Sequence, residues 1–128
     1  MTMPAMPAAV TQFFTASQTG DAQAWADAFA SEGIFHDPVG QPPIVGRTAI
    51  HAFIASVLPS FSPFLGLTPR EAHVVGNSVA VSWSGAAVTT TGTPVNWSGI
   101  NVYDLDEDGL IAEARAYFNR AIFQAQLG

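Results

Sequence analysis

The sequence predicts a single α+β domain, in which about three N-terminal helices pack on a curved antiparallel or mixed β-sheet. Apolar residues recur at helical spacing as far as Val57, and the four segments beyond it are rich in β-branched and aromatic residues and separated by turn sequences. A chain of 128 residues is long enough for one domain with a sizeable core. Helices followed by an antiparallel meander are typical of α+β domains whose helices cover one sheet face.

The N-terminal part of the chain contains the helical patterns. We expect residues 1–7 to form a flexible tail and residues 8–128 to form the domain. Gly20 ends the first helix and Asp21 supplies an N-cap for the second, whereas Thr48 caps the third helix, which the two following prolines close. The expected buried stripes are Val10, Phe13, Phe14 and Ser17 on the first helix, Trp25, Ala28 and Phe29 on the second, and Ile50, Phe53, Ile54 and Val57 on the third.

The strand patterns allow a prediction of one sheet face. Every second residue of the last two strands lies on the same sheet face, and most of these residues have small side chains. Two interpretations stay open: the small residues line a cavity, or they let the helices pack closely. Residues 59–65 are expected to form a loop. The expected strands are 34–37, 67–75, 78–88, 95–105 and 110–121. The shared face comprises Trp97, Gly99, Asn101 and Tyr103 on one strand, and Ala112, Ala114, Ala116 and Phe118 on the other.

The composition excludes several classes of partner. Charged residues make up 11% of the chain, Lys is absent and the formal net charge is −6. Without a basic patch to displace counterions from phosphates, we expect no nucleic-acid partner, no anionic membrane surface and no polyphosphate substrate. The excess of acidic over basic residues suits an apolar, weakly charged small molecule better than any of these partners. No Cys is present, which excludes disulfides and thiolate chemistry, and the start lacks a signal-peptide pattern, so we expect a cytoplasmic protein.

Two polar residues are the candidates for chemistry. Asp37 follows an apolar segment and precedes Pro38 at a chain reversal. Burial disfavours the charged form of a carboxyl, which raises its pKa and makes it a better general base near neutral pH. The alternative is that Asp37 only starts a turn. Asn101 lies among apolar residues, where its amide would either donate to a developing oxyanion or bond a neighbouring loop.

We expect no metal site and no cofactor site. The three histidines are isolated in the sequence and no Cys accompanies them, so they do not form a convincing set of metal ligands. The serines lack the G-x-S-x-G surroundings of an activated nucleophile, and no glycine-rich phosphate loop exists. The acidic run at 104–108 lacks the full EF-hand pattern and is interpreted as a solvated turn.

The segment DPVGQPPI at 37–44, followed by Gly46-Arg47 and Phe53, resembles the bacterial steroid Δ5-3-ketoisomerases. These enzymes belong to the nuclear-transport-factor-2-like (NTF2-like) superfamily, which includes the SnoaL-like polyketide cyclases. Matching helix boundaries and last strands extend the resemblance to about residues 8–123. It implies a cone-shaped fold, proton transfer without a cofactor, and a homodimer formed through the outer sheet face, where we expect Trp83 to lie.

The resemblance implies roles for single residues. Asp37 occupies the position of the general base, and Asn101 falls where the family has a protonated Asp that donates to the oxyanion. Phe13 stands in place of the oxyanion-hole Tyr. Ile54 replaces a second Tyr that supports the hydrogen-bond network of the oxyanion hole. Losing one oxyanion-hole donor reduces the rate by about 10²–10³-fold. The predicted substrate-binding residues are Phe13, Phe53, Ile54, Trp97, Tyr103, Ala116 and Phe118.

Three functions follow as hypotheses. The first is an isomerase in which Asp37 moves a proton between carbons of an apolar carbonyl compound while Asn101 donates to its oxygen. The second is a non-catalytic binder of steroid-like or polyketide-like ligands, which would explain the missing tyrosines. The third is a SnoaL-like cyclase, which would use the same acidic base to close a ring.

Overall fold

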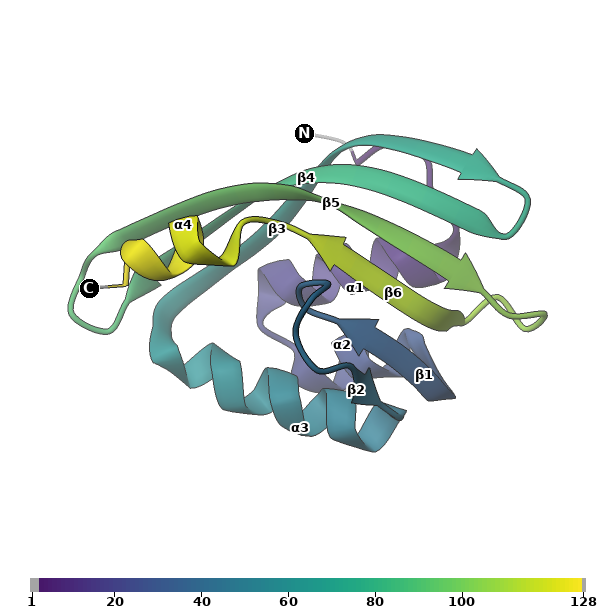
Figure 1. Cartoon of the computed structure of the whole chain (residues 1–128), viewed down its shortest axis with the longest axis horizontal. Helices are drawn as coiled ribbons and strands as arrows, with labels where there is room; N and C mark the ends of the chain where they lie inside the picture. Colours follow the sequence, from purple (N-terminus) through teal and green to yellow (C-terminus); the bar gives the residue numbers. More distant parts are fainter. Residues whose placement is uncertain (1–2, 128) are drawn as a thin grey trace.

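The computed structural model describes residues 3–127, which form one six-stranded mixed sheet curved over a layer of helices (Figure 1). The predicted α+β class, with helices on one sheet face, is confirmed. The elements in chain order are α1 (Ala8–Thr19), α2 (Ala22–Asp27), β1 (Phe29–His36), β2 (Ile44–Val45), α3 (Arg47–Val57), the 3₁₀ turn η1 (Leu58–Ser60), β3 (Phe61–Val75), β4 (Ser78–Thr89), β5 (Pro94–Leu105), β6 (Ile111–Tyr117) and α4 (Arg120–Ala125).

The strand order is β2-β1-β6-β5-β4-β3, and β1 pairs in parallel with β6 while the other neighbours are antiparallel. The long strands β3, β4 and β5 arch over α1, whereas α3 lies at the opposite side of the molecule and α4 crosses the end of the arch (Figure 1).

The structure corrects the predicted boundaries of the second and third helices. Helix α2 ends at Asp27, so Phe29 begins β1, five residues before the predicted strand. Pairing explains the difference, because Phe29 stands opposite Ile111 of β6 across the parallel ladder. Thr48 is not the N-cap of α3, since Gly46 precedes its first residue, Arg47. The Arg47 guanidinium donates from Nε (3.0 Å) and Nη2 (2.6 Å) to the carbonyl oxygen of Phe29 and so ties α3 to β1.

Two further predictions in the C-terminal half are wrong. The predicted loop at 59–65 is short, because β3 already begins at Phe61 and tolerates its prolines through irregularities in its register with β4. The last strand ends at Tyr117 rather than at 121. Asn119 then caps α4, accepting a hydrogen bond at Oδ1 from the backbone N–H of Ile122 (3.1 Å).

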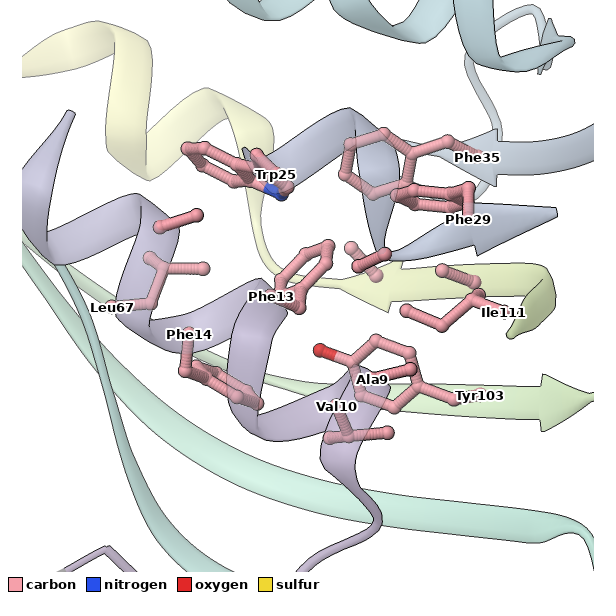
Figure 2. Close-up of a cluster of buried hydrophobic side chains, with 14 of the residues drawn as sticks. Ala9, Val10, Phe13, Phe14, Trp25, Phe29, Phe35, Leu67, Tyr103 and Ile111 are labelled. Atoms are coloured by element: carbon pink, nitrogen blue, oxygen red, sulfur yellow. The ribbon is translucent and has the colours of Figure 1, made fainter. Parts of the chain in front are cut away.

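An aromatic cluster around Phe13 forms the main core, with α1 on one side and β5 and β6 on the other (Figure 2). The Phe13 ring lies 5.2 Å from the Tyr103 ring and 5.3 Å from the Trp25 ring, both at steep angles that favour edge-to-face contact. Met3 and Met6 are partly buried against this cluster. Residues 1–2 of the predicted tail lie outside the described residues.

Glycines opposite two tryptophans shape the inner sheet face. In the β4–β5 register, Trp83 stands opposite Gly99 and Trp97 stands opposite Gly85. A Cβ atom at Gly99 would lie 2.8 Å from Trp83 Cζ2, and one at Gly85 would lie 2.7 Å from Trp97 Cε2, so only glycine leaves room for the two indoles. The expectation that Trp83 lies on the outer face is therefore wrong, since its side chain is inside the fold and the residue is 3% exposed.

Candidate functional site

A cavity of about 460 Å³ opens between α3, α4, the loop after β1 and the inner sheet face. Ala116 of β6 is part of its wall, whereas Ala114 is packed in the core and Gly99 makes room for Trp83, so the small residues of this face serve both the cavity and close packing. The wall contains all but one of the sequence-predicted site residues, namely Asp37, Asn101, Phe13, Phe53, Ile54, Trp97, Ala116 and Phe118. The exception is Tyr103, which is completely buried and does not reach the wall.

Asp37 is the residue directly after β1 and is held at the cavity by its own loop. The backbone N–H of Val39 donates to the carbonyl oxygen of Ala116 (2.8 Å), so the loop is fastened beside β6. The Asp37 side chain lies against apolar wall residues, and burial raises its pKa from 3.8 to about 6. Within residues 3–127 no group donates a hydrogen bond to its carboxylate, so nothing offsets the effect of desolvation. A carboxylate in this state is a competent general base at neutral pH.

Asn101 is 1% exposed and both ends of its amide have partners. Its Oδ1 accepts a hydrogen bond from the Trp83 indole Nε1–H (2.9 Å), and its Nδ2 donates to the Tyr103 hydroxyl (2.8 Å). An indole N–H only donates, so it must face the amide oxygen and thereby determines which way the amide points. One of the two Nδ2 hydrogens remains for a ligand in the cavity that Asn101 lines.

Tyr103 lies behind Asn101 and is coupled to the same site. Burial is the main cause that raises the pKa of its hydroxyl well above 10, and the charge of Asp37 raises it further, whereas the hydrogen bond from Asn101 acts in the opposite direction. Tyr103 therefore stays protonated at physiological pH. Because its oxygen accepts from Asn101, its own hydrogen points elsewhere. Asn101 and Tyr103 are thus joined by a hydrogen bond, and Asp37 acts on Tyr103 through its charge.

The sequence analysis missed Trp83 and Arg120 as parts of the cavity wall. A signal for Trp83 was present, because apolar Val79, Val81 and Trp83 alternate with small or polar residues along β4 and share its buried face. No comparable signal pointed to Arg120, since the predicted last strand extends to residue 121 and covers the start of α4.

The described part of the chain contains no group of three His, Asp or Glu side chains arranged to hold a metal ion. The same residues include no helix that is both long and apolar enough to cross a membrane.

Comparison with known proteins places the chain in a family. The SnoaL-like domain family matches residues 10–114, which is most of the chain. No curated protein matches.

Three solved structures share the fold. The first is a hypothetical protein with ketosteroid isomerase-like fold from Catenulispora acidiphila DSM 44928, in complex with trimethylamine (TM-score 0.86, 19% identity, 97% of this chain and 95% of that one). The second is SalBIII, described as an epoxide hydrolase/cyclase-like enzyme in pyran ring formation in the polyether salinomycin (TM-score 0.77, 23% identity, 88% and 89%). The third is Rv0760c from Mycobacterium tuberculosis, in complex with estradiol-17β-hemisuccinate (TM-score 0.78, 20% identity, 89% and 93%).

These likenesses over nearly the whole chain agree with the expected NTF2-like cone. Matched over residues 10–114, the chain belongs to the family of SnoaL-like domains.

Proposed function

We propose that this protein is a cofactor-free enzyme that transfers a proton within an apolar carbonyl compound, with Asp37 as the general base. The observation that carries the proposal is a carboxyl with pKa of about 6 on the wall of the same cavity as the Asn101 amide. At pH 7 about nine-tenths of a carboxyl with this pKa is ionised, so the base is available without prior activation.

The proposed reaction moves a double bond. The Asp37 carboxylate removes a proton from the carbon between the carbonyl and the double bond, and the electron pair of the broken C–H bond moves towards the carbonyl oxygen. Asn101 donates its free N–H to the developing oxyanion. The carboxylic acid then returns the proton to the far carbon of the dienolate, which brings the double bond into conjugation. Atoms and charge balance without a co-reactant.

The cavity's chemistry supports an apolar substrate. Aromatic and aliphatic side chains make up most of its wall, and the volume of about 460 Å³ suits a ligand of steroid or polyketide size. Rv0760c, which shares this fold, was crystallised in complex with a steroid ester, estradiol-17β-hemisuccinate. This likeness supports a steroid skeleton for the first substrate to test, and the proposed reaction requires that it carry a ketone.

The direct test is solvent-proton exchange together with isomerisation. A β,γ-unsaturated ketosteroid is incubated in deuterated buffer, and conjugated-enone absorbance and deuterium incorporation are measured. We expect turnover that Asp37→Asn abolishes. Asp108→Asn, which removes an exposed carboxylate from the β5–β6 turn, is the charge-matched control and leaves turnover unchanged. Equal rates for Asp37→Asn and the wild type would refute the proposed base.

A second candidate is a non-catalytic binder of the same ligands. It is favoured by Phe13 and Ile54, which line the cavity without the hydroxyl groups that the isomerases carry there. Tight binding of a ketosteroid with neither isomerisation nor deuterium incorporation, in the wild type and in Phe13→Tyr alike, would select this candidate.

A cyclase is the third candidate, supported by the SnoaL-like family and by the ring-forming role named for SalBIII. The same Asp37 would then remove a proton from the group that closes the ring. A polyketide substrate that yields a cyclic product, with no isomerisation of the ketosteroid, would select it.

A homodimer through the outer sheet face stays a prediction. Ile100 and Tyr117 are neighbours in the β5–β6 register and are 50% and 47% exposed, which supports this face as the contact. Analytical ultracentrifugation of the wild type and of Ile100→Arg tests this prediction. We expect the wild type to sediment as a dimer and Ile100→Arg to sediment as a monomer.

A further inference from the structure

Arg120 is an exposed residue that lines the cavity from the first turn of α4. In the described chain no side-chain or backbone group pairs with its guanidinium. The other three arginines all have partners: Arg47 donates to the Phe29 carbonyl, Arg70 to the Ser84 hydroxyl, and Arg115 to Asp104 and Glu113. Arg120 is therefore the cation that this lysine-free protein leaves for a ligand at its cavity.

The position of Arg120 assigns it to the mouth of the cavity rather than to the proposed reaction centre. Among residues 3–127, Asp37 and Arg120 are the only members of the cavity wall that carry charge at neutral pH. Arg120 is exposed to solvent at the start of α4, whereas Asp37 is half-buried directly after β1, so the two charges line the cavity from different elements. Gln124 follows Arg120 at a spacing of four residues, lies on the same side of α4, and lines the cavity beside it.

We propose that Arg120 binds a carboxylate on the substrate, so that the natural ligand is an apolar carbonyl compound with one acidic group remote from the reacting carbon. This inference rests on the proposed function for the position of the reacting carbonyl.

A single carboxylate fits the charges better than a polyphosphate. A guanidinium binds a carboxylate through two parallel hydrogen bonds, and Gln124 offers a neutral amide donor next to it. A polyphosphate would need several cations, whereas the described cavity wall has one and the protein as a whole carries a net charge of −6. The long-range repulsion from this net charge also disfavours ligands with several negative charges.

The test compares two ligands that differ only in this charge: 3-oxo-4-androstene-17β-carboxylic acid and its methyl ester. All three tryptophans, Trp25, Trp83 and Trp97, line the cavity, so quenching of intrinsic fluorescence reports binding of either compound. We expect the acid to bind the wild type about 2- to 5-fold more tightly than the ester, which is the range for a solvent-accessible ion pair. Raising the salt concentration from about 20 to 500 mM should remove most of this preference.

Variants assign the preference to one residue. Arg120→Gln is expected to bind acid and ester equally. Arg120→Lys should keep part of the preference, because the positive charge remains but the two parallel N–H donors of the guanidinium are lost. Arg70→Gln, which removes an exposed arginine that does not line the cavity, is the matched control and keeps the full preference.

The outcomes separate this inference from the proposed function. Equal affinity for acid and ester in the wild type, or a preference that survives in Arg120→Gln, overturns the carboxylate inference and leaves proton transfer by Asp37 intact. A preference lost in Arg120→Gln, together with neither isomerisation nor deuterium exchange in any substrate, upholds the inference and defeats the proposed reaction. Binding of neither compound overturns both.

Discussion

Replacing Asp37 by Asn should stabilise the protein above neutral pH while it abolishes the proposed activity. Burial raises the pKa of Asp37 from 3.8 to about 6, so the folded state holds its proton more tightly than the unfolded chain does. Between these two pKa values the folded state binds more protons, and the free energy of unfolding therefore falls as the pH rises. The ionised carboxylate destabilises the fold, and an amide of the same shape does not.

The magnitude follows from the pKa difference. A difference of about 2 in pKa corresponds to about 3 kcal/mol once the pH is above both values. The Asp37 residue keeps some contact with solvent, so screening reduces this figure, and we expect Asp37→Asn to gain about 1–3 kcal/mol at pH 8. About half of that gain should already be present at pH 5, because the unfolded carboxyl is ionised there and the folded one is not.

Urea unfolding of the wild type and of Asp37→Asn at pH 5 and pH 8 measures the difference in their free energies of unfolding. The contributions of the other carboxylates are the same in both proteins and cancel. Asp108→Asn is again the control, with the same difference from the wild type at both pH values. A gain that is absent at pH 8, or that is larger at pH 5 than at pH 8, would refute the argument that burial raises the pKa of Asp37. The result does not depend on the identity of the substrate.

Three further predictions concern the surroundings of the two site residues. Phe13→Tyr should raise any isomerase rate by about 10- to 100-fold, because it adds an oxyanion donor on the cavity wall, and an unchanged rate would contradict that role. Trp83→Phe removes the N–H that orients the Asn101 amide, so denaturation should show that the free energy of unfolding falls by about 1–3 kcal/mol. Steady-state kinetics of the same variant should show a fall in kcat that is larger than the change in KM. Gly99→Ala would force a Cβ atom against the Tyr117 carbonyl oxygen, so the unfolding free energy should drop by at least about 2 kcal/mol, whereas a wild-type Tm would contradict the close packing.

The helical half of the fold was largely predictable from local sequence. Gly20 in a left-handed conformation and the Asp21 cap, which accepts from the Ala24 N–H at 3.0 Å, ended one helix and began the next as expected. The start of β1 was not predictable, because Phe29 belongs to a strand only through its parallel pairing with Ile111 of β6, far away in the chain. Long-range pairing of this kind leaves no local pattern.

The site shows the same division. The residues before Asp37 and the alternation around Asn101 identified both residues as candidates, since a lone polar side chain among apolar neighbours stands out in a sequence. That Trp83 orients the Asn101 amide and that Arg120 reaches the cavity could not be inferred, because both depend on strand register and on a helix missed at the C-terminus.

The sequence by itself determined the α+β class and the absence of cysteine chemistry, because hydrophobic periodicity and composition are properties of the chain alone. The tertiary structure decided that the inner face and the helices enclose a cavity, that Asp37 is buried enough to hold its proton to about pH 6, and that Arg120 lines the same cavity. These features depend on which residues meet across the sheet, and desolvation and charge pairing act only at the distances that folding sets.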